Sequence, residues 1–344
     1  DAIAEQICNQ LVAFSGFGFP KSHSASFALV AYQSVWLKRY RPAAFYCGVI
    51  NQQPMGFYSI EVLLGDARRH GIDILPPCIA RSNEKWKPER TERGRWALRT
   101  GLSPIAQMGG AGRHALPSAA IARIVEARAE QPFADLADFC KRTRLNREMV
   151  ANLIRSGACD ALRTPAISRR DLLWQLGEIE YRPEEFPLNP AHTEADLARL
   201  SQQEEEVWEH ELMDFATAGN VMRHYRAQLR RRRIASGWEV KQMARGAHIR
   251  VAGMMAIRQR PETAKGIIFV SLEDESGLLD LVIKPEVWER YRETLYREPL
   301  VVVEGEVQRS SNAVSVLVQK AIPLAELLGE VASEAVAGAT KSWF

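Results

Sequence analysis

The sequence has few cysteines, and none are spaced as in a metal-binding or redox motif. Its five cysteines are isolated, and no Cys-x-x-Cys pair occurs. An odd number of separated cysteines also provides no disulfide framework. The seven histidines are equally scattered. We therefore expect no metal-binding residues and no disulfides in this chain, and the cysteine usage fits a reducing, cytoplasmic compartment.

The sequence also lacks a long apolar run. No stretch approaches the roughly 20 apolar residues that a membrane span needs, so no membrane partner is expected. No signal peptide is recognisable at the start, which reads DAIAEQICNQ without an initiating Met. Because this start is typical of the middle of a helix, we predict that the chain is a fragment.

The composition is that of a globular protein with room for two or three domains. Of its 344 residues, 46% are hydrophobic and 25% are charged, and the net charge is +3. The charges are unevenly placed, because residues 221–260 hold eleven Arg or Lys and one acid, whereas residues 194–214 hold eight acids and one Arg. The two blocks indicate contact with a polyanion, pairing with each other, or two solvated helix faces. Nucleic acid is favoured by one arginine run: Arg230, Arg231, Arg232 and Arg233.

Residues 14–58 form the stretch around which the rest of the chain is organised. Aromatic residues and glycines alternate at its start, and Lys21, Ser22 and His23 follow in one turn. A helix is predicted to begin there, with a serine of that turn as its N-cap, and to stop at Pro42. A lysine, a hydroxyl and an imidazole at a helix N-terminus can hold an anion. The alternative is an ordinary capped helix whose lysine and histidine face solvent.

Residues 16–58 resemble the C-terminal part of the fingers region in bacterial C-family DNA polymerases, with the sequence GFGFPKSHSASFALVAYQSVWLKRYRPAAFYCGVINQQPMGFY. These polymerases are the α subunits of the replicative polymerase III type. Residues 50–77, INQQPMGFYSIEVLLGDARRHGIDILPP, resemble its error-prone branch, which acts in damage-induced mutagenesis. The resemblance implies that Lys21, Ser22 and His23 contact the triphosphate of an incoming nucleotide or the nearby template backbone.

Residues 79–177 resemble the tandem helix-hairpin-helix module of the same family. Such a module grips duplex DNA through phosphates, because a glycine turn and a helix N-terminus present backbone N–H groups. The first hairpin is expected at residues 105–109, with Gly109 as a DNA-binding residue. It departs from the family at Gln107, where glycine is usual, and a glycine-rich insertion follows at 110–114. These departures leave its DNA contact open.

The second hairpin, LNREMVANLIRSGACDAL at residues 145–162, matches the family well. Ser156 and Gly157 are predicted to make its turn and to bind DNA. A plain helical hairpin is the alternative for any single turn of this kind.

From residue 247 the hydrophobic period becomes that of strands. Three strands, a helix and two strands are predicted in the order of an OB-fold, at residues 249–253, 266–270, 279–283, 285–297, 300–307 and 313–318. The segment RQRPETAKGIIFVSLEDESG resembles the OB-fold of the same polymerases. The acidic residues 273–275 are predicted to form a solvated turn.

We expect this domain to offer positive charge to a single strand of nucleic acid. The residues that would supply it are Arg250, Arg258, Arg260 and Lys265. Exposed aromatic residues are expected to be few, because Phe269 is predicted to lie in the core, and Trp288 and Tyr291 on the helix. Single-strand binding is therefore predicted to be electrostatic and weak. The alternative is an OB-fold that serves as a protein-docking surface.

Between these modules, residues 178–236 are predicted to form an acidic and basic helical linker. Three prolines interrupt its first part, and an acidic helix is expected from Glu194. Residues 216–221 are shortened relative to the family and lack its His-Pro pair. The Ala-rich tail, residues 326–344, is predicted to be loose, and its Lys-Ser-Trp-Phe end resembles a natural C-terminus.

We predict a multidomain α+β protein, mainly α-helical in the fingers end (1–78) and the helix-hairpin-helix module (79–177), followed after the linker by a β-barrel OB-fold (237–325). The resemblance implies the C-terminal, DNA-holding portion of an error-prone DNA-directed DNA polymerase in damage-induced synthesis and repair. Its implied partners are primed DNA, single-stranded template, a deoxynucleoside triphosphate, mutagenesis accessory proteins and, indirectly, the sliding clamp. The alternative is a free-standing DNA-binding or adaptor protein built from the same modules.

Polymerase chemistry needs metal ions held by carboxylates, and the family carries an Asp-x-Asp pair that is absent from these 344 residues. The resemblance therefore implies that the intact enzyme uses Mg²⁺ with ligands outside this chain. We predict no catalytic residues here and no polymerase activity of the chain alone.

Overall fold

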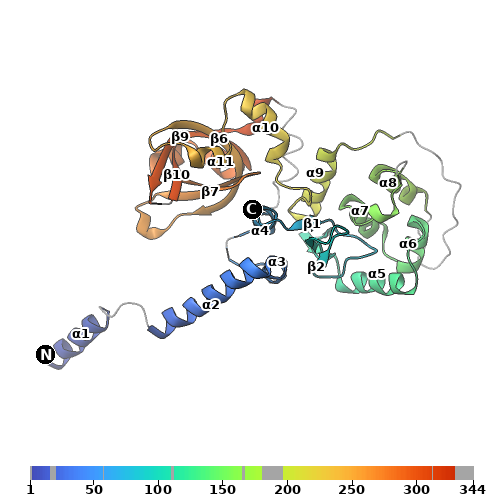
Figure 1. Cartoon of the computed structure of the whole chain (residues 1–344), viewed down its shortest axis with the longest axis horizontal. Coiled ribbons are helices and arrows are strands. Elements are labelled where there is room, and N and C mark those ends of the chain that lie inside the picture. The colour runs from blue at the N-terminus through green and yellow to red at the C-terminus, as the bar shows by residue number, and fades with distance from the viewer. Residues whose placement is uncertain are drawn as a thin grey trace.

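The computed structural model describes residues 2–15, 21–56, 58–109, 112–164, 167–179, 197–311 and 313–329. Figure 1 shows a mixed helical body on one side, a barrel on the other, and a helical arm that leads away from both. Within the described ranges, no helix is long and apolar enough to cross a membrane.

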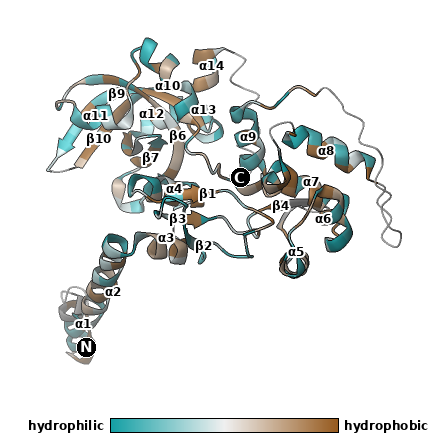
Figure 2. Cartoon of the chain, turned by 45° about the vertical axis from the view of Figure 1, so that its right-hand side comes forward, coloured by the Kyte–Doolittle hydropathy of each residue, from teal (hydrophilic) through white to brown (hydrophobic). Residues whose placement is uncertain are grey.

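The arm consists of α1 (Ala2–Ser15) and α2 (Lys21–Tyr40). None of the residues of α2 is buried, although hydrophobic and hydrophilic residues both occur along it (Figure 2). The helix begins at Lys21, so Ser22 lies inside its first turn, where its carbonyl accepts a hydrogen bond from Ser26 Oγ. The prediction of a serine N-cap at this turn is therefore wrong. Residues 16–20 lie outside the described ranges.

The C-terminal end of α2 leads into the helical body. Helices α3 (Pro42–Ile50) and α4 (Ile60–Arg69) follow, and Ser59 caps α4 by accepting a hydrogen bond from the Val62 N–H. Lys38 near the end of α2 binds Asp66 of α4, with 2.6 Å between Nζ and Oδ2.

The rest of the body begins with strands rather than helices. A three-stranded sheet in the order β1-β3-β2 is followed by a two-stranded hairpin, β4 and β5, and by a group of helices. The strands are β1 (Asp73–Leu75), β2 (Lys87–Arg90), β3 (Trp96–Arg99), β4 (Ala106–Gly109) and β5 (Gly112–Ala115). The helices are α5 (Ser118–Glu130), α6 (Leu136–Thr143), α7 (Arg147–Arg155), α8 (Arg169–Glu178) and α9 (Gln202–Met213).

One hydrophobic core extends from α3 to the end of α9. It contains fully buried residues from each part of the body, among them Tyr46, Leu98, Phe139, Leu153 and Phe215. The hydrophobic core therefore continues across residue 78, where a boundary was predicted. The fingers end and the helix-hairpin-helix region share this core.

The barrel confirms the predicted OB-fold. Its five strands close in the order β10-β8-β7-β6-β9, with β8 and β10 parallel and the other pairs antiparallel. They are β6 (His248–Gln259), β7 (Ile268–Asp274), β8 (Gly277–Ile283), β9 (Leu300–Ser310) and β10 (Ala313–Pro323). Between β8 and β9 lie α12 (Pro285–Arg290) and α13 (Arg292–Arg297), where one helix was predicted. Gly305 permits the close approach of β9 and β10, because a Cβ there would lie 2.3 Å from the Leu317 carbonyl oxygen.

The predicted linker is not a separate unit. Its helix α9 contributes Leu212 and Met213 to the core of the helical body. Its second helix, α10 (Met222–Arg231), packs with α14 (Leu324–Leu328) on the outside of β6 and β9, and α11 (Gly237–Gln242) follows it. Three linker prolines and Glu194 lie outside the described residues, as do residues 330–344. Glu326 lies in α14, so the tail is not loose from that residue.

Candidate nucleic-acid interface

A pocket of about 570 Å³ lies on the outer face of the barrel strands. Its residues are Ile257 on β6, Ser271 on β7, Leu278 and Asp280 on β8, Val314 on β10, with Tyr58, Lys241 and Arg309. Ser271 donates a hydrogen bond to Asp280 across the two strands at 3.1 Å. We call this the strand-face pocket. It combines two cations with an aromatic and apolar wall, which is what a single strand with stacked bases needs.

The same face of β7 carries an exposed aromatic side chain. Phe269 is 40% exposed and points outward like Ser271, two residues further along the strand. The prediction that Phe269 lies in the core is therefore wrong. Trp288, in contrast, is buried in the barrel core on α12, and Tyr291 packs against that core at the end of this helix. Phe269, together with Tyr58 in the pocket, can therefore stack on bases.

The four cations predicted on this domain have different environments. Arg250 is half-buried and paired with Glu304 on the neighbouring strand, with 3.1 Å between Nε and Oε1. The Arg258 guanidinium lies 5.0 Å from the ring centre of Tyr296, and partial burial lowers its pKa. Arg260 and Lys265 are exposed in the connection between β6 and β7. They remain available to a phosphate backbone.

The arginine run is exposed at the end of α10 and in the turn after it. Within the residues that the structure describes, Arg230, Arg231, Arg232 and Arg233 make no ion pair. The basic residues just upstream do: Arg223 and His224 bind Glu206 of the acidic helix, and Arg226 binds Asp274 and Glu275. Part of the basic block therefore forms ion pairs with acidic residues. Among the described residues, the arginine run takes no part in them.

The second hairpin has the predicted turn, but the side chain of Arg169 covers it. Gly157 has a φ of 82°, in the left-handed region that favours glycine. Ser156 is buried, and its hydroxyl donates to the Leu153 carbonyl at 3.1 Å. A Cβ on Gly157 would lie 2.3 Å from Nη2 of Arg169, so the guanidinium covers the turn. The Ser156 hydroxyl and the Gly157 Cα therefore face other groups of the chain, and DNA binding by these two residues stays a prediction.

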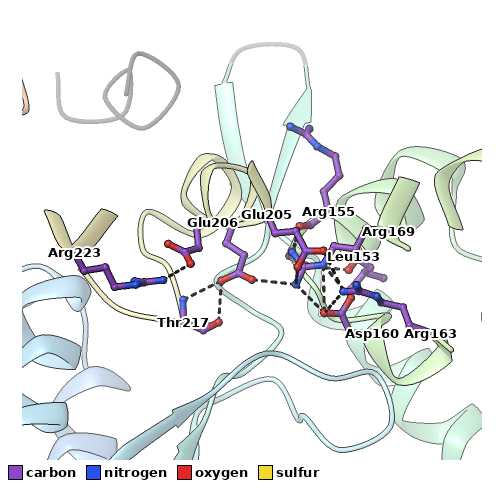
Figure 3. Close-up of polar contacts among 11 residues, drawn as sticks. Leu153, Arg155, Asp160, Arg163, Arg169, Glu205, Glu206, Thr217 and Arg223 are labelled. Atoms are coloured by element: carbon purple, nitrogen blue, oxygen red, sulfur yellow. Dashed lines mark hydrogen bonds and ion pairs between the residues drawn. The ribbon is translucent and has the colours of Figure 1, made fainter. Parts of the chain in front are cut away.

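The side chain that closes the turn is held by carboxylates from two directions (Figure 3). Nη2 of Arg169 lies 2.8 Å from Asp160 Oδ2 and 3.1 Å from Glu209 Oε1, and only 3% of the side chain is exposed. Burial opposes the charge, but the hydrogen bonds and ion pairs with Asp160 and the α9 acids raise the pKa of Arg169 above its ordinary value.

Acidic helix α9 covers the arginines around this hairpin as well. Arg155 binds Glu211 at 2.5 Å, and Arg163 binds Glu205 at 3.3 Å. The Arg155 guanidinium also lies over the Trp208 ring, 5.4 Å from its centre. These contacts neutralise Arg155 and Arg163, whereas Arg147 in the first turn of α7 is exposed and binds the Ile179 carbonyl.

The first hairpin is not a helical hairpin at all. Strands β4 and β5 form an antiparallel pair in which Gly109 faces Gly112. Gly109 therefore ends a strand, and the prediction that it lies in a turn between two helices is wrong. The described part of the insertion, residues 112–114, lies in β5.

Two of the three acids predicted to form a solvated turn are buried. Glu273 and Asp274 end β7 with 1% and 3% of their surfaces exposed, because α4 and α10 pack against that end. Asp274 accepts a hydrogen bond from the Gly237 N–H at 2.8 Å and pairs with Arg226 at 3.0 Å. Burial and the nearby Glu61 raise the pKa of Glu273 to about 8.

Three residues of the strand-face pocket were missed by sequence reasoning. Arg309 follows the predicted strand 300–307 directly, so its place at the barrel rim could have been found. Lys241 and Tyr58 carried no such signal, since each reaches the pocket from an element outside the barrel strands.

Comparisons with known proteins match both halves of the chain. Residues 71–172 match a family model described as a helix-hairpin-helix motif, and residues 249–324 match one described as an OB-fold nucleic acid binding domain. A curated relative named error-prone DNA polymerase, from Anaeromyxobacter sp. (strain K), is 39% identical over 326 residues, which are 94% of this chain and 28% of the relative. The error-prone DNA polymerase of Azoarcus sp. (strain BH72) is 38% identical over 342 residues, 96% of this chain and 30% of the relative.

The chain is similar to one part of error-prone DNA polymerases. The resemblance seen in the sequence is thereby confirmed over nearly the whole chain, through the arm, the helical body and the barrel. The chain spans somewhat under a third of the length of these error-prone DNA polymerases.

The residues implied as a nucleotide site lie on the arm. Lys21, Ser22 and His23 are exposed in the first turn of α2, where the His23 ring lies 4.4 Å from that of Phe27. Figure 1 shows this turn far from the barrel, so the structure does not join them to the strand-face pocket.

The described residues do not suit a metal ion. Among them, no group of three or more His, Cys, Asp or Glu is placed to hold one. Asp274 is already bound to Arg226, and Glu61 is bound to His210 at 2.7 Å. We therefore derive no metal-dependent step from this chain.

Proposed function

We propose that this chain is the DNA-holding, C-terminal portion of an error-prone DNA-directed DNA polymerase, a cytoplasmic nucleotidyltransferase of damage-induced DNA synthesis and repair. The observation that carries the proposal is the similarity to polymerases named error-prone over 94% to 96% of this chain. It is supported by the closed barrel, whose outer face combines cations with an exposed aromatic ring.

In this proposal the barrel holds the single-stranded part of the DNA. Phe269 and Tyr58 stack with bases, and Lys241 and Arg309 bind the backbone between them. Stacking on one aromatic side chain contributes about 1–3 kcal/mol per base and tolerates any sequence. Tolerance of any sequence suits a polymerase, which must accept every template.

The remaining parts of the reaction belong to the intact enzyme. There we propose that Lys21, Ser22 and His23 contact the incoming triphosphate or the template backbone, and that Mg²⁺ is held by carboxylates outside this chain. Mutagenesis accessory proteins and, through them, the sliding clamp complete the proposed partners. These assignments rest on the family resemblance of the arm.

Primed DNA binding tests the proposal. The purified chain is expected to bind a primed template with a logarithm of affinity that falls linearly as the logarithm of salt concentration rises, because bound phosphates release counterions. Phe269→Ala is expected to weaken binding about tenfold, equivalent to one lost stack. Fluorescence anisotropy with a labelled primer-template at several salt concentrations measures both effects.

Trp174→Ala is the matched control, since Trp174 is 45% exposed but lies on α8 in the helical body. An affinity that does not change with salt would contradict the phosphate contacts. Equal losses in the two variants would contradict the stacking role of Phe269. With Mg²⁺ and deoxynucleotides the chain is expected to extend no primer.

A further inference from the structure

A second pocket, of about 380 Å³, is lined by residues of β6, β9 and β10, by the turn after α10 and by Met243 just after α11. We call it the arginine pocket. Three cationic or titratable side chains and one carboxylate line it: Arg233, His248, Arg250 and Glu304. Its remaining wall is Ala235, Met243, Ile249, Gly305 and Gln319.

We propose that a single strand of nucleic acid leaves the strand-face pocket, crosses the C-terminal end of α11 and enters the arginine pocket, where the arginine run binds its phosphates. This inference rests on the proposed function and extends its site. It predicts a longer footprint than the strand face alone provides.

The charges favour a polyanion in the arginine pocket. Glu304 is matched by Arg250, which leaves Arg233 without an ion pair among the described residues. The other arginines of the run and Arg245 stand exposed around it. A second acid of β9, Glu306, lies opposite His248, and Glu239 on α11 is already bound by the Ser236 backbone N–H and hydroxyl, which lower its pKa. A surplus of positive charge therefore remains at this surface.

The backbone holds the arginine run over the pocket. Arg233 has a φ of 58°, so the chain reverses direction directly after α10. Two residues later, the Ala235 N–H donates to the Arg250 carbonyl at 2.8 Å, and Ala235 pairs with Val251 as a parallel bridge. The turn is thus fixed to β6, and its arginines are carried on a rigid edge rather than on a free loop.

The two pockets share one wall. Lys241 lines the strand-face pocket and Met243 lines the arginine pocket, and only one residue separates them. Arg309 binds the carbonyl oxygens of both, at 2.5 Å and 3.0 Å, while also lining the strand-face pocket. A nucleic-acid strand whose phosphates pass Arg309 therefore reaches the arginine pocket along a positively charged surface.

The length dependence of binding tests the track. The strand-face pocket alone should hold a short oligothymidylate of about 6 nucleotides, and the whole track one of about 16, within the range known for OB-folds. The variant Arg232→Gln/Arg233→Gln in the full chain is expected to leave binding of the short strand unchanged. For the long strand it should reduce the salt slope by about 1.4, since each lost phosphate contact of a single strand removes about 0.7.

Arg290→Gln/Arg292→Gln is the control, because it removes the same charge from exposed arginines on α12 and α13 that line neither pocket. Equal slopes for the wild type and Arg232→Gln/Arg233→Gln, or an equal loss in the control, would overturn the track while leaving the strand-face pocket intact. Failure of the wild type to bind either strand would overturn the proposed function together with the track. An unchanged melting temperature of the variants shows that they fold.

Discussion

Arg169→Ala is expected to destabilise the helical body by roughly 3–5 kcal/mol, the effect of removing one partner from a buried ion pair. The guanidinium binds both Asp160 and Glu209 through Nη2, and Glu205 lies 3.8 Å from the same nitrogen. Without it, the buried Glu209 carboxylate would lose this cationic partner. Denaturant unfolding followed by far-ultraviolet circular dichroism measures the change.

Arg170→Ala is the control for this substitution. Arg170 follows Arg169 on the same helix but is partly exposed, and its partner Glu204 is half-exposed at 3.3 Å. A surface pair of this kind contributes about 0–1 kcal/mol. If the two variants lost similar stability, the buried network would not be what holds α9 to the hairpin.

Glu273→Gln is expected to stabilise the chain at pH 8.5 and to have little effect at pH 5. Burial and the nearby Glu61 raise the pKa of Glu273 from an ordinary 4.5 to about 8. Below pH 4.5 the carboxyl is neutral in both folded and unfolded chains, so its ionisation does not lower the free energy of unfolding. As the pH rises toward 8 only the unfolded chain ionises, and the folded state loses stability by up to about 1.4 kcal/mol per pH unit.

The charged groups that face Glu273 lie on α4 and on β7 itself. Arg68, Arg69 and Glu61 lie on α4, and Asp274 follows it in the chain. Glutamine keeps the shape of the side chain but has no group that ionises in this pH range. The expected gain at pH 8.5 is therefore a few kcal/mol, measured as the shift of the denaturant midpoint at pH 5, 6.5 and 8.5.

Glu262→Gln, at an exposed position in the connection between β6 and β7, should shift nothing at any of these pH values. A gain from Glu273→Gln that is the same at pH 5 and pH 8.5 would show that ionisation of Glu273 is not the cause.

The barrel could be predicted from the sequence because its signals are local. Alternating residues in β8 and β9 and the turn before Gly277 fix strand positions without knowledge of the rest of the chain. Phe269 was misplaced because it stands in the continuous apolar run Ile267-Ile268-Phe269-Val270, in which periodicity does not say which residue faces outward.

The candidate site was harder to predict, because it depends on contacts between distant segments. The turn at Ser156 and Gly157 could be predicted, but the Arg169 side chain that covers it is held by Glu209, and this contact depends on how α9 packs much later in the chain. The sequence predicts Glu273 in a loop, but α4 packs closely against it. A Cβ on Gly65 of α4 would lie 2.7 Å from Oε1 of Glu273. Local patterns carry no information on either contact.

The central claim is that this chain holds single-stranded DNA on the barrel and not at the second hairpin. The most direct measurement is ultraviolet cross-linking of the chain to a thymidine-rich strand, with the linked peptides identified by mass spectrometry. The account predicts cross-links at Phe269 or Tyr58 and in residues 230–245. Cross-links confined to residues 153–163, with none on the barrel, would contradict it.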